Sequence, residues 1–287
     1  MTITAPPTAT ARNPMPATRR TALVAGIFYL TTFVASIPAL ALLDPILHHS
    51  DYIVGAGADT RVVWAVILDV INAFAGIGTA VTLFPVVKRQ NEASALGFVT
   101  SRVIEAAVIL IGVVCLLAIV TLHQDAAGTT GAGAATLITT GKALVAVRDW
   151  TFLLGPGLMP VMNALLLGSL LFRSRLVPRI IPAVGLIGAP LLLISNVATL
   201  FGLFDQVSTP AALLAFPIAA WELTLGIYLT VRGFRRAPLL GVAGPAGRGV
   251  LIGLSQALRP RPVSCCPRCT SSGPCRRSSG RRPSGAR

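Results

Sequence analysis

The feature that most constrains this chain is a series of apolar runs, each long enough to cross a lipid bilayer. A helix rises about 1.5 Å per residue, so about 20 apolar residues cross a hydrocarbon core about 30 Å thick. Such segments must be helical, because a helix satisfies its own backbone hydrogen bonds where water is absent. We therefore expect an all-α polytopic membrane protein, built as a bundle of six transmembrane helices. The predicted spans cover about residues 21–43, 62–87, 95–122, 150–172, 180–204 and 210–231.

Composition agrees with this class. The chain is 54% hydrophobic and 12% charged, with a mean hydropathy of +0.76. Soluble globular domains are about 25% charged. The lipid bilayer is therefore the first expected partner, and the cytoplasmic membrane is the expected location.

Basic residues predict the orientation of the spans. Loops on the cytoplasmic side of a membrane protein carry an excess of Lys and Arg. Ten basic residues flank the spans on the side of the two termini, whereas Arg61, Lys142 and Arg148 are the three on the opposite side. Both termini are therefore expected in the cytoplasm. The longest predicted loop, residues 123–149, lies outside, and from Ala134 its sequence is also compatible with a helix that extends the fourth span.

The formal net charge of +14 does not indicate nucleic-acid binding. Twelve of the 24 basic residues lie from Arg232 onward, and no Asp or Glu follows Glu222. The body of the chain is therefore close to neutral, and the high charge belongs to the C-terminal segment alone. We expect no nucleic-acid partner.

Three segments follow from these patterns. Residues 1–18, rich in Thr, Ala and Pro, predict a disordered lead-in, and residues 19–236 form the six-helix domain. Residues 237–287 are rich in Arg, Pro, Ser, Gly and Cys and predict a disordered tail. We interpret that tail as non-native coding sequence, read out of frame or past a natural terminus. Its Cys266-x-x-Cys269 supplies only half of a zinc-ribbon spacing, so no metal is predicted there.

Four polar residues on spans three, four and six share one predicted layer in the cytoplasmic half of the membrane. Arg102 and Glu105 stand three residues apart, so they share a helix face and can pair. Glu222 lies at a similar depth and can accept from the same guanidinium, which has five donors. Asn163 falls at the same level. The four residues form a candidate intramembrane polar cluster.

A second candidate site lies in the outer half. Asp69 is an intramembrane acid too far from Arg102 to pair with it, with Asn72 close by on the same helix and Asn196 of span five at a comparable depth. Intramembrane ionisable groups mark proton or substrate sites or act as interhelical hydrogen-bonding groups. We favour the structural role for the Arg102 cluster and the proton or ligand role for Asp69.

The sequence carries none of the catalytic, nucleotide-binding or metal-binding motifs that are common in soluble enzymes. Asp44 and His48 are four residues apart, as metal ligands on a helix can be, but a solvated loop explains them more simply. No Walker loop, Gly-x-Ser-x-Gly elbow or His-Glu-x-x-His motif occurs. We expect no catalytic residues, no cofactor and no metal, and hence no enzyme.

The expected function is that of a non-enzymatic membrane component that binds a small or lipidic ligand or a partner protein. The alternative is a small proton-coupled secondary transporter that uses Asp69 and Glu222. A weaker third class is an embedded enzyme that uses the outer His and Asp residues. The Gly155, Pro156, Gly157 and Pro160 cluster in span four predicts a packing kink rather than the broken helix of a transporter, because no second broken helix or internal repeat is visible.

The order of four segments resembles a family of bacterial six-span membrane proteins known as domain of unknown function DUF4386. The resemblance rests on "AGIFYLTTFVASI" in span one, "SRVIEAA" in span three, "FRSRLVPRIIPAVGLIG" before and within span five, and "WELTLGIYLTVRGF" in span six. It covers about residues 19 to 236 and implies six helices in an inner membrane. The family has no established activity, so it implies no catalytic residues.

Overall fold

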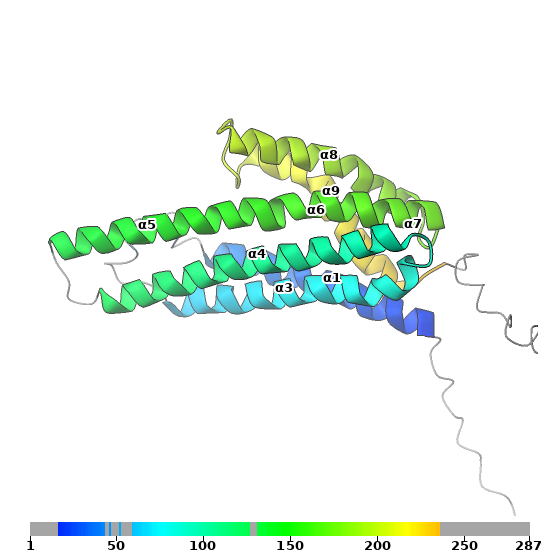
Figure 1. Cartoon of the computed structure of the whole chain (residues 1–287), viewed down its shortest axis with the longest axis horizontal. Helices are drawn as coiled ribbons and strands as arrows, with labels where there is room; N and C mark the ends of the chain where they lie inside the picture. Colours follow the sequence, from blue (N-terminus) through cyan, green and yellow to red (C-terminus); the bar gives the residue numbers. More distant parts are fainter. Residues whose placement is uncertain (1–16, 44–45, 47–51, 53–58, 127–130, 236–287) are drawn as a thin grey trace, which may run out of the picture. The chain divides into compact units, whose positions relative to one another are not determined.

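The computed structural model describes residues 17–43, 46, 52, 59–126 and 131–235, and every regular element in these ranges is a helix (Figure 1). The expected tail, the half zinc motif, and Asp44 and His48 lie outside the described residues. So does the expected lead-in, except for its last two residues, which begin the first helix. The helices are α1 (Ala17–Leu42), α3 (Asp59–Val87), α4 (Glu92–Asp125), α5 (Ala132–Phe152), η1 (Leu153–Leu158), α6 (Met159–Asn163), η2 (Ala164–Gly168), α7 (Ser169–Ser174), α8 (Ile180–Leu200) and α9 (Thr209–Val231).

Six of the described helical segments are long and apolar enough to cross a membrane, which confirms the predicted all-α, six-span architecture. The fourth is one continuous helical rod, Ala132–Ser174, made of α5, η1, α6, η2 and α7. Its 43 residues rise roughly 60 Å, about twice the thickness of a hydrocarbon core.

This rod replaces the long loop expected over residues 123–149 and confirms its alternative, a helix that extends the fourth span. Helix α4 runs to Asp125, and α5 already begins at Ala132. Leu137, Leu144 and Val145 of α5 pack against a cluster of buried apolar residues from α3 and α4, which stabilises the helical form. The Gly- and Thr-rich sequence suggested a loop because its helix propensity is low, but tertiary packing overrides propensity.

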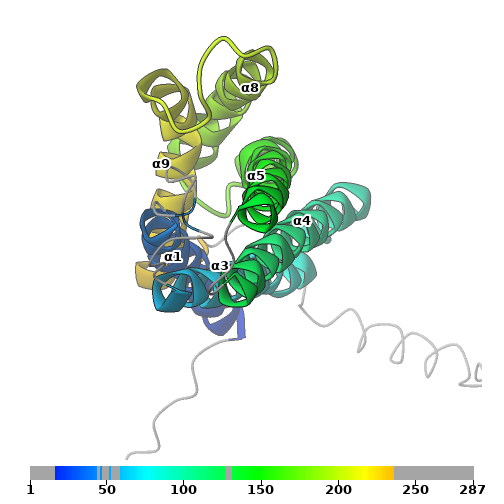
Figure 2. The ribbon, with the colours of Figure 1, turned by 90° about the vertical axis from the view of Figure 1, so that its left-hand side faces the viewer.

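The helices follow one another around the bundle. Helix α1 packs against α3 and α9, α3 against α4, and α4 against α5. Helices α8 and α9 form a pair, and α8 contacts the fourth span through η1, α6, η2 and α7. We call the end that carries Ala17 and Val231 the near end, and the end that carries the α8–α9 connection, residues 201–208, the far end. Figure 2 looks onto the far end, where the α8–α9 pair stands apart from α5.

Glycines allow the closest helix contacts. A Cβ on Gly185 of α8 would lie 2.5 Å from the indole of Trp221, and one on Gly188 would lie 3.0 Å from the backbone nitrogen of Ile218. A Cβ on Gly26 of α1 would lie 2.8 Å from the carbonyl oxygen of Gly226 on α9. Small residues at such crossings let helix backbones approach in a membrane, where packing replaces the hydrophobic effect as the driving force.

Arg19 fixes the near end. Its guanidinium donates to the carbonyl oxygens of Leu229, Thr230 and Val231 at 3.0, 2.7 and 3.0 Å. These carbonyls belong to the last turn of α9 and have no partner within the helix. The Arg19 guanidinium therefore caps α9 and interacts favourably with the negative end of its helix dipole. It also links the start of α1 to the end of α9.

Asp59 fixes the far end of α3 and α4. Its Oδ1 accepts from the Tyr52 hydroxyl at 2.8 Å and lies 2.8 Å from Nδ1 of His123, while Oδ2 accepts from Gln124 at 3.3 Å. The ring centroids of Tyr52 and His123 are 5.1 Å apart. Burial and the hydrogen bond to Asp59 raise the pKa of Tyr52, so its hydroxyl stays a donor at neutral pH.

Candidate functional site

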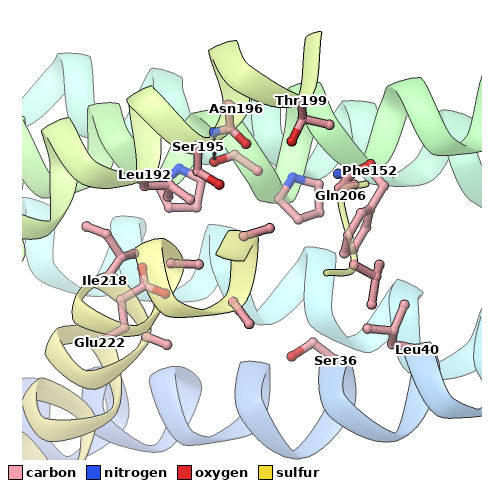
Figure 3. A pocket seen from close by; sticks show the side chains of 18 of the residues that line it. Ser36, Leu40, Phe152, Leu192, Ser195, Asn196, Thr199, Gln206, Ile218 and Glu222 are labelled. Carbon is pink, nitrogen blue, oxygen red and sulfur yellow. Dashed lines mark hydrogen bonds between the residues drawn. The ribbon is translucent and has the colours of Figure 1, made fainter. Parts of the chain in front are cut away.

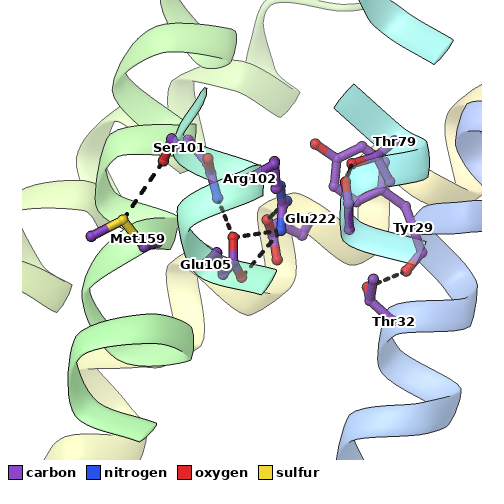
Figure 4. Close-up of polar contacts among 10 residues, drawn as sticks. Tyr29, Thr32, Thr79, Ser101, Arg102, Glu105, Met159 and Glu222 are labelled. Atoms are coloured by element: carbon purple, nitrogen blue, oxygen red, sulfur yellow. Dashed lines mark hydrogen bonds and ion pairs between the residues drawn. The ribbon is translucent and has the colours of Figure 1, made fainter. Parts of the chain in front are cut away.

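The four residues of the predicted polar cluster come together between α4, α6 and α9, and Figure 4 shows three of them, Arg102, Glu105 and Glu222. Arg102 Nη1 donates to both oxygens of Glu105, at 3.3 and 3.1 Å, and its Nη2 donates to Oε1 of Glu222. Asn163 Nδ2 donates to Oε2 of Glu105 at 2.8 Å. The predicted pairing is therefore present in all its parts.

Arg102 is held from several sides. The residue is only 3% exposed, and its guanidinium carbon lies 5.4 Å from the ring centroid of Tyr29 and 5.9 Å from that of Phe98. Both separations are within the range of cation–π attraction. Its Nε has no hydrogen-bond partner among the described residues, and neither has Oδ1 of Asn163. The cluster is thus packed from several sides, but two of its polar atoms have no hydrogen-bond partner among the described residues.

The two glutamates are not equivalent. Glu105 accepts three hydrogen bonds through its two oxygens. Glu222 accepts one, at Oε1, and in the described part of the chain its Oε2 accepts none. The Glu222 side chain is 13% exposed. It is therefore the carboxylate with more free capacity, although the Glu105 side chain, at 11%, is almost as exposed.

That accessible surface faces a cavity of about 580 Å³. The cavity lies between the α8–α9 pair and the helices α1, α3, α4 and η1, with Arg102, Glu105 and Glu222 among its lining residues. In Figure 3, Glu222 and Ile218 lie at one end of it, and Gln206, Phe152 and Leu40 at the other. A volume of this size matches sites for small molecules.

The residue spacing along α9 explains the length of the cavity. Thr209, Ala212, Ala215, Ala219 and Glu222 all line it and repeat at three or four residues, so they form one stripe along the helix. Thirteen residues separate the first from the last, which corresponds to about 20 Å. The small alanine side chains leave the room that larger residues would fill.

Polar groups line the opposite wall and the far end of the cavity. Ser195, Asn196 and Thr199 occupy one face of α8. At the α8–α9 connection, Gln206 Nε2 and Ser208 Oγ are buried and have no hydrogen-bond partner among the described residues. Burying a polar group away from water without a hydrogen-bond partner costs free energy, so these atoms are suited to bind water or a ligand.

Asp69 lies in a smaller adjoining cavity of about 50 Å³, whose lining includes Asn72 and Arg148. Arg148 is 6% exposed and close enough to interact electrostatically with Asp69. Asp69 is therefore not a lone intramembrane acid. The sequence interpretation missed this pairing because it placed Arg148 in the outer loop. The signal for it was the helix-compatible sequence from Ala134 onward.

The predicted grouping of Asp69 with Asn72 and Asn196 is present only in part. Asn72 lines both the small and the large cavity, whereas Asn196 lines the large one alone. Asn196 donates instead to the carbonyl oxygen of Gly157 at 2.8 Å.

That carbonyl belongs to η1, the π-helical stretch over Leu153–Leu158 that contains Pro156. Proline removes a backbone donor, and the wider turn of a π-helix frees a carbonyl for a side chain. The Gly and Pro cluster thus shapes the cavity wall without interrupting the fourth span, as the packing interpretation expected.

Within the described ranges, no three His, Cys, Asp or Glu side chains are placed to hold a metal ion. What the arrangement offers is a long, mostly apolar cavity that ends at an ionic cluster. Such a site can bind and orient a molecule with an apolar body and one polar end.

Comparisons with known proteins identify a family without an activity. The family model described as domain of unknown function DUF4386 matches residues 24–233. No curated protein and no solved structure matches the chain.

Proposed function

For this chain, which belongs to the DUF4386 family of unknown function, we propose a role as a non-enzymatic membrane protein that binds a small amphipathic molecule in the 580 Å³ cavity. The apolar body of the ligand lies along the alanine stripe of α9. Its polar end meets Glu222.

The observation that carries this proposal is the position of the ionic cluster at the inner end of the cavity. Polar residues that only fix helix register need no access from outside. Here Arg102, Glu105 and Glu222 all contribute to the wall of a cavity that reaches the far end. The structural and the ligand-binding roles are therefore compatible, because Arg102 and Glu105 lock the helices and Glu222 keeps an oxygen for the ligand.

The proposal includes an orientation. Nine basic residues of the described ranges flank the near end of the spans, so we place both termini in the cytoplasm and the cavity entrance on the outer side of the cell membrane. A ligand then enters from outside or from the outer leaflet.

The test is a thermal-shift screen of the purified full chain against small amphipathic compounds. Ala219→Phe places a ring in the cavity beside Glu222, and Ala107→Phe, at an exposed position of α4 outside the cavity lining, is its matched control. We expect stabilising compounds whose effect Ala219→Phe removes and Ala107→Phe retains. A screen without such compounds, or compounds that both variants still bind, would contradict the proposal.

Proton-coupled transport is the second candidate, and the adjoining cavity favours it. Asp69 and Arg148 both line the small cavity, which shares Ser36 and Asn72 with the large one. A proton on Asp69 would alter the charge next to a bound ligand. In this case Asp69→Asn abolishes pH-dependent uptake of a screened ligand into proteoliposomes while leaving expression intact. Unchanged uptake by this variant would exclude Asp69 as the coupling residue.

A further inference from the structure

We propose that the ligand of the cavity carries a single positive charge, which lies against the free oxygen of Glu222. This inference rests on the proposed binding function and specifies its ligand class as organic monocations with an apolar body.

The first argument is the charge balance of the cluster. One guanidinium, that of Arg102, faces two carboxylates, those of Glu105 and Glu222. With all three groups ionised, the cluster carries one negative charge in excess. Such a charge inside a membrane is costly unless a partner neutralises it. A bound monocation supplies that partner.

The second argument is that no other cation among the described residues is placed to do so. Among the charged side chains of the described residues, only Arg102, Glu105 and Glu222 line the large cavity. Arg148 lines the small cavity with Asp69, and its Nη1 lies 3.4 Å from Oδ1 of Asp149. Arg19 is engaged with three carbonyls at the near end. The excess charge therefore stays at the cavity's inner end.

The third argument is geometric. Arg102 presents its Nη donors to the two glutamates, and its one unpartnered donor, Nε, is buried, so it offers little to an anionic ligand. Glu105 already accepts three hydrogen bonds, from Arg102 and Asn163. Glu222 is the group with free capacity, and it accepts but does not donate when ionised. An ammonium or a similar cation fits this position, and a carboxylate or sulfonate meets like charge.

The experiment compares three compounds that share a benzyl body and differ in charge: benzyltrimethylammonium, benzyl alcohol and benzylsulfonate. Their dissociation constants are measured by calorimetry on the full chain in detergent. We expect the cation to bind about tenfold or more tightly than the neutral and the anionic compounds. Glu222→Gln should remove the difference, and Glu92→Gln, at an exposed carboxylate of α4 far from the cavity, should retain it.

The outcomes distinguish a failure of this inference from a failure of the proposed binding function. If the three compounds bind alike and Ala219→Phe abolishes all binding, the cavity is a ligand site but a proton neutralises the cluster, and the inference is wrong. If the cation does not bind, the inference is also wrong, and the compound screen decides the function independently. If Glu222→Gln fails to fold, the comparison of the three compounds on the native chain still tests the inference. Glu222→Asp then serves as the variant, because it keeps the negative charge and draws the carboxylate back toward the helix.

Discussion

At the scale of single residues, Arg102 determines what the other members of its cluster can do. Its pairing with Glu105 was predictable from a spacing of three residues on one helix, because that spacing fixes a shared face. The participation of Glu222 and Asn163 followed from depth along their spans. The sequence could not show which carboxylate keeps a free oxygen, because that depends on the side-chain rotamers where three helices pack together.

We expect Arg102→Ala to lower the free energy of unfolding by about 3–5 kcal/mol, because it leaves two buried carboxylates without a cation. Glu222→Gln should cost less, because Arg102 retains Glu105. The double variant should lose less than the sum of the two, as measured by denaturant unfolding in detergent. Additive losses would show that the pair does not interact.

A similar comparison applies to Asp69 and Arg148. Arg148→Ala leaves the half-buried Asp69 without a nearby positive charge, whereas Asp69→Asn leaves an arginine that still has Asp149 nearby. We therefore expect Arg148→Ala to lower the unfolding midpoint more than Asp69→Asn, and the double variant to recover part of that loss. Lys142→Ala, at an exposed position of the same helix, is the control. Equal midpoints for Arg148→Ala and Lys142→Ala would contradict the pairing.

At the scale of elements, the six spans were predictable because apolar runs of this length admit only a helix in a bilayer. The fourth span was not predicted at its full length. Its first half is rich in Gly, Ala and Thr, and packing against α4 stabilises the helical form. That error also removed Arg148 from the predicted site, so the assignment of one element changed the apparent environment of Asp69.

Close packing of α8 on α9 holds the wall of the cavity, and Gly185 tests it. Gly185→Ala would place a methyl group 2.5 Å from the Trp221 indole, so we expect a loss of about 1–3 kcal/mol in the free energy of unfolding. Gly76→Ala is the matched control, because a Cβ there meets nothing within 4 Å. It should leave stability unchanged or slightly raised. A neutral Gly185→Ala would mean that the two helices are not in this contact.

At the scale of the whole molecule, the basic residues predict which end faces the cytoplasm, and surface labelling can test this. In a chain whose native cysteines are replaced by serine, we introduce Glu92→Cys at the near end or Asp205→Cys at the far end, both exposed. A membrane-impermeant maleimide should label the second in intact cells and the first only after permeabilisation. The reverse pattern would invert the topology and turn the cavity entrance toward the cytoplasm.

The central claim is that a water-accessible cavity leads from the far end to Glu222, and thiol accessibility tests it most directly. In the same cysteine-replaced chain, Ala219→Cys lies within the cavity, one helical turn from Glu222, whereas Leu223→Cys lies outside the cavity lining on a side chain that is 37% exposed. The positively charged 2-(trimethylammonium)ethyl methanethiosulfonate should modify the first and leave the second unreacted. Equal rates at the two positions, or an unreactive Ala219→Cys, would contradict the account.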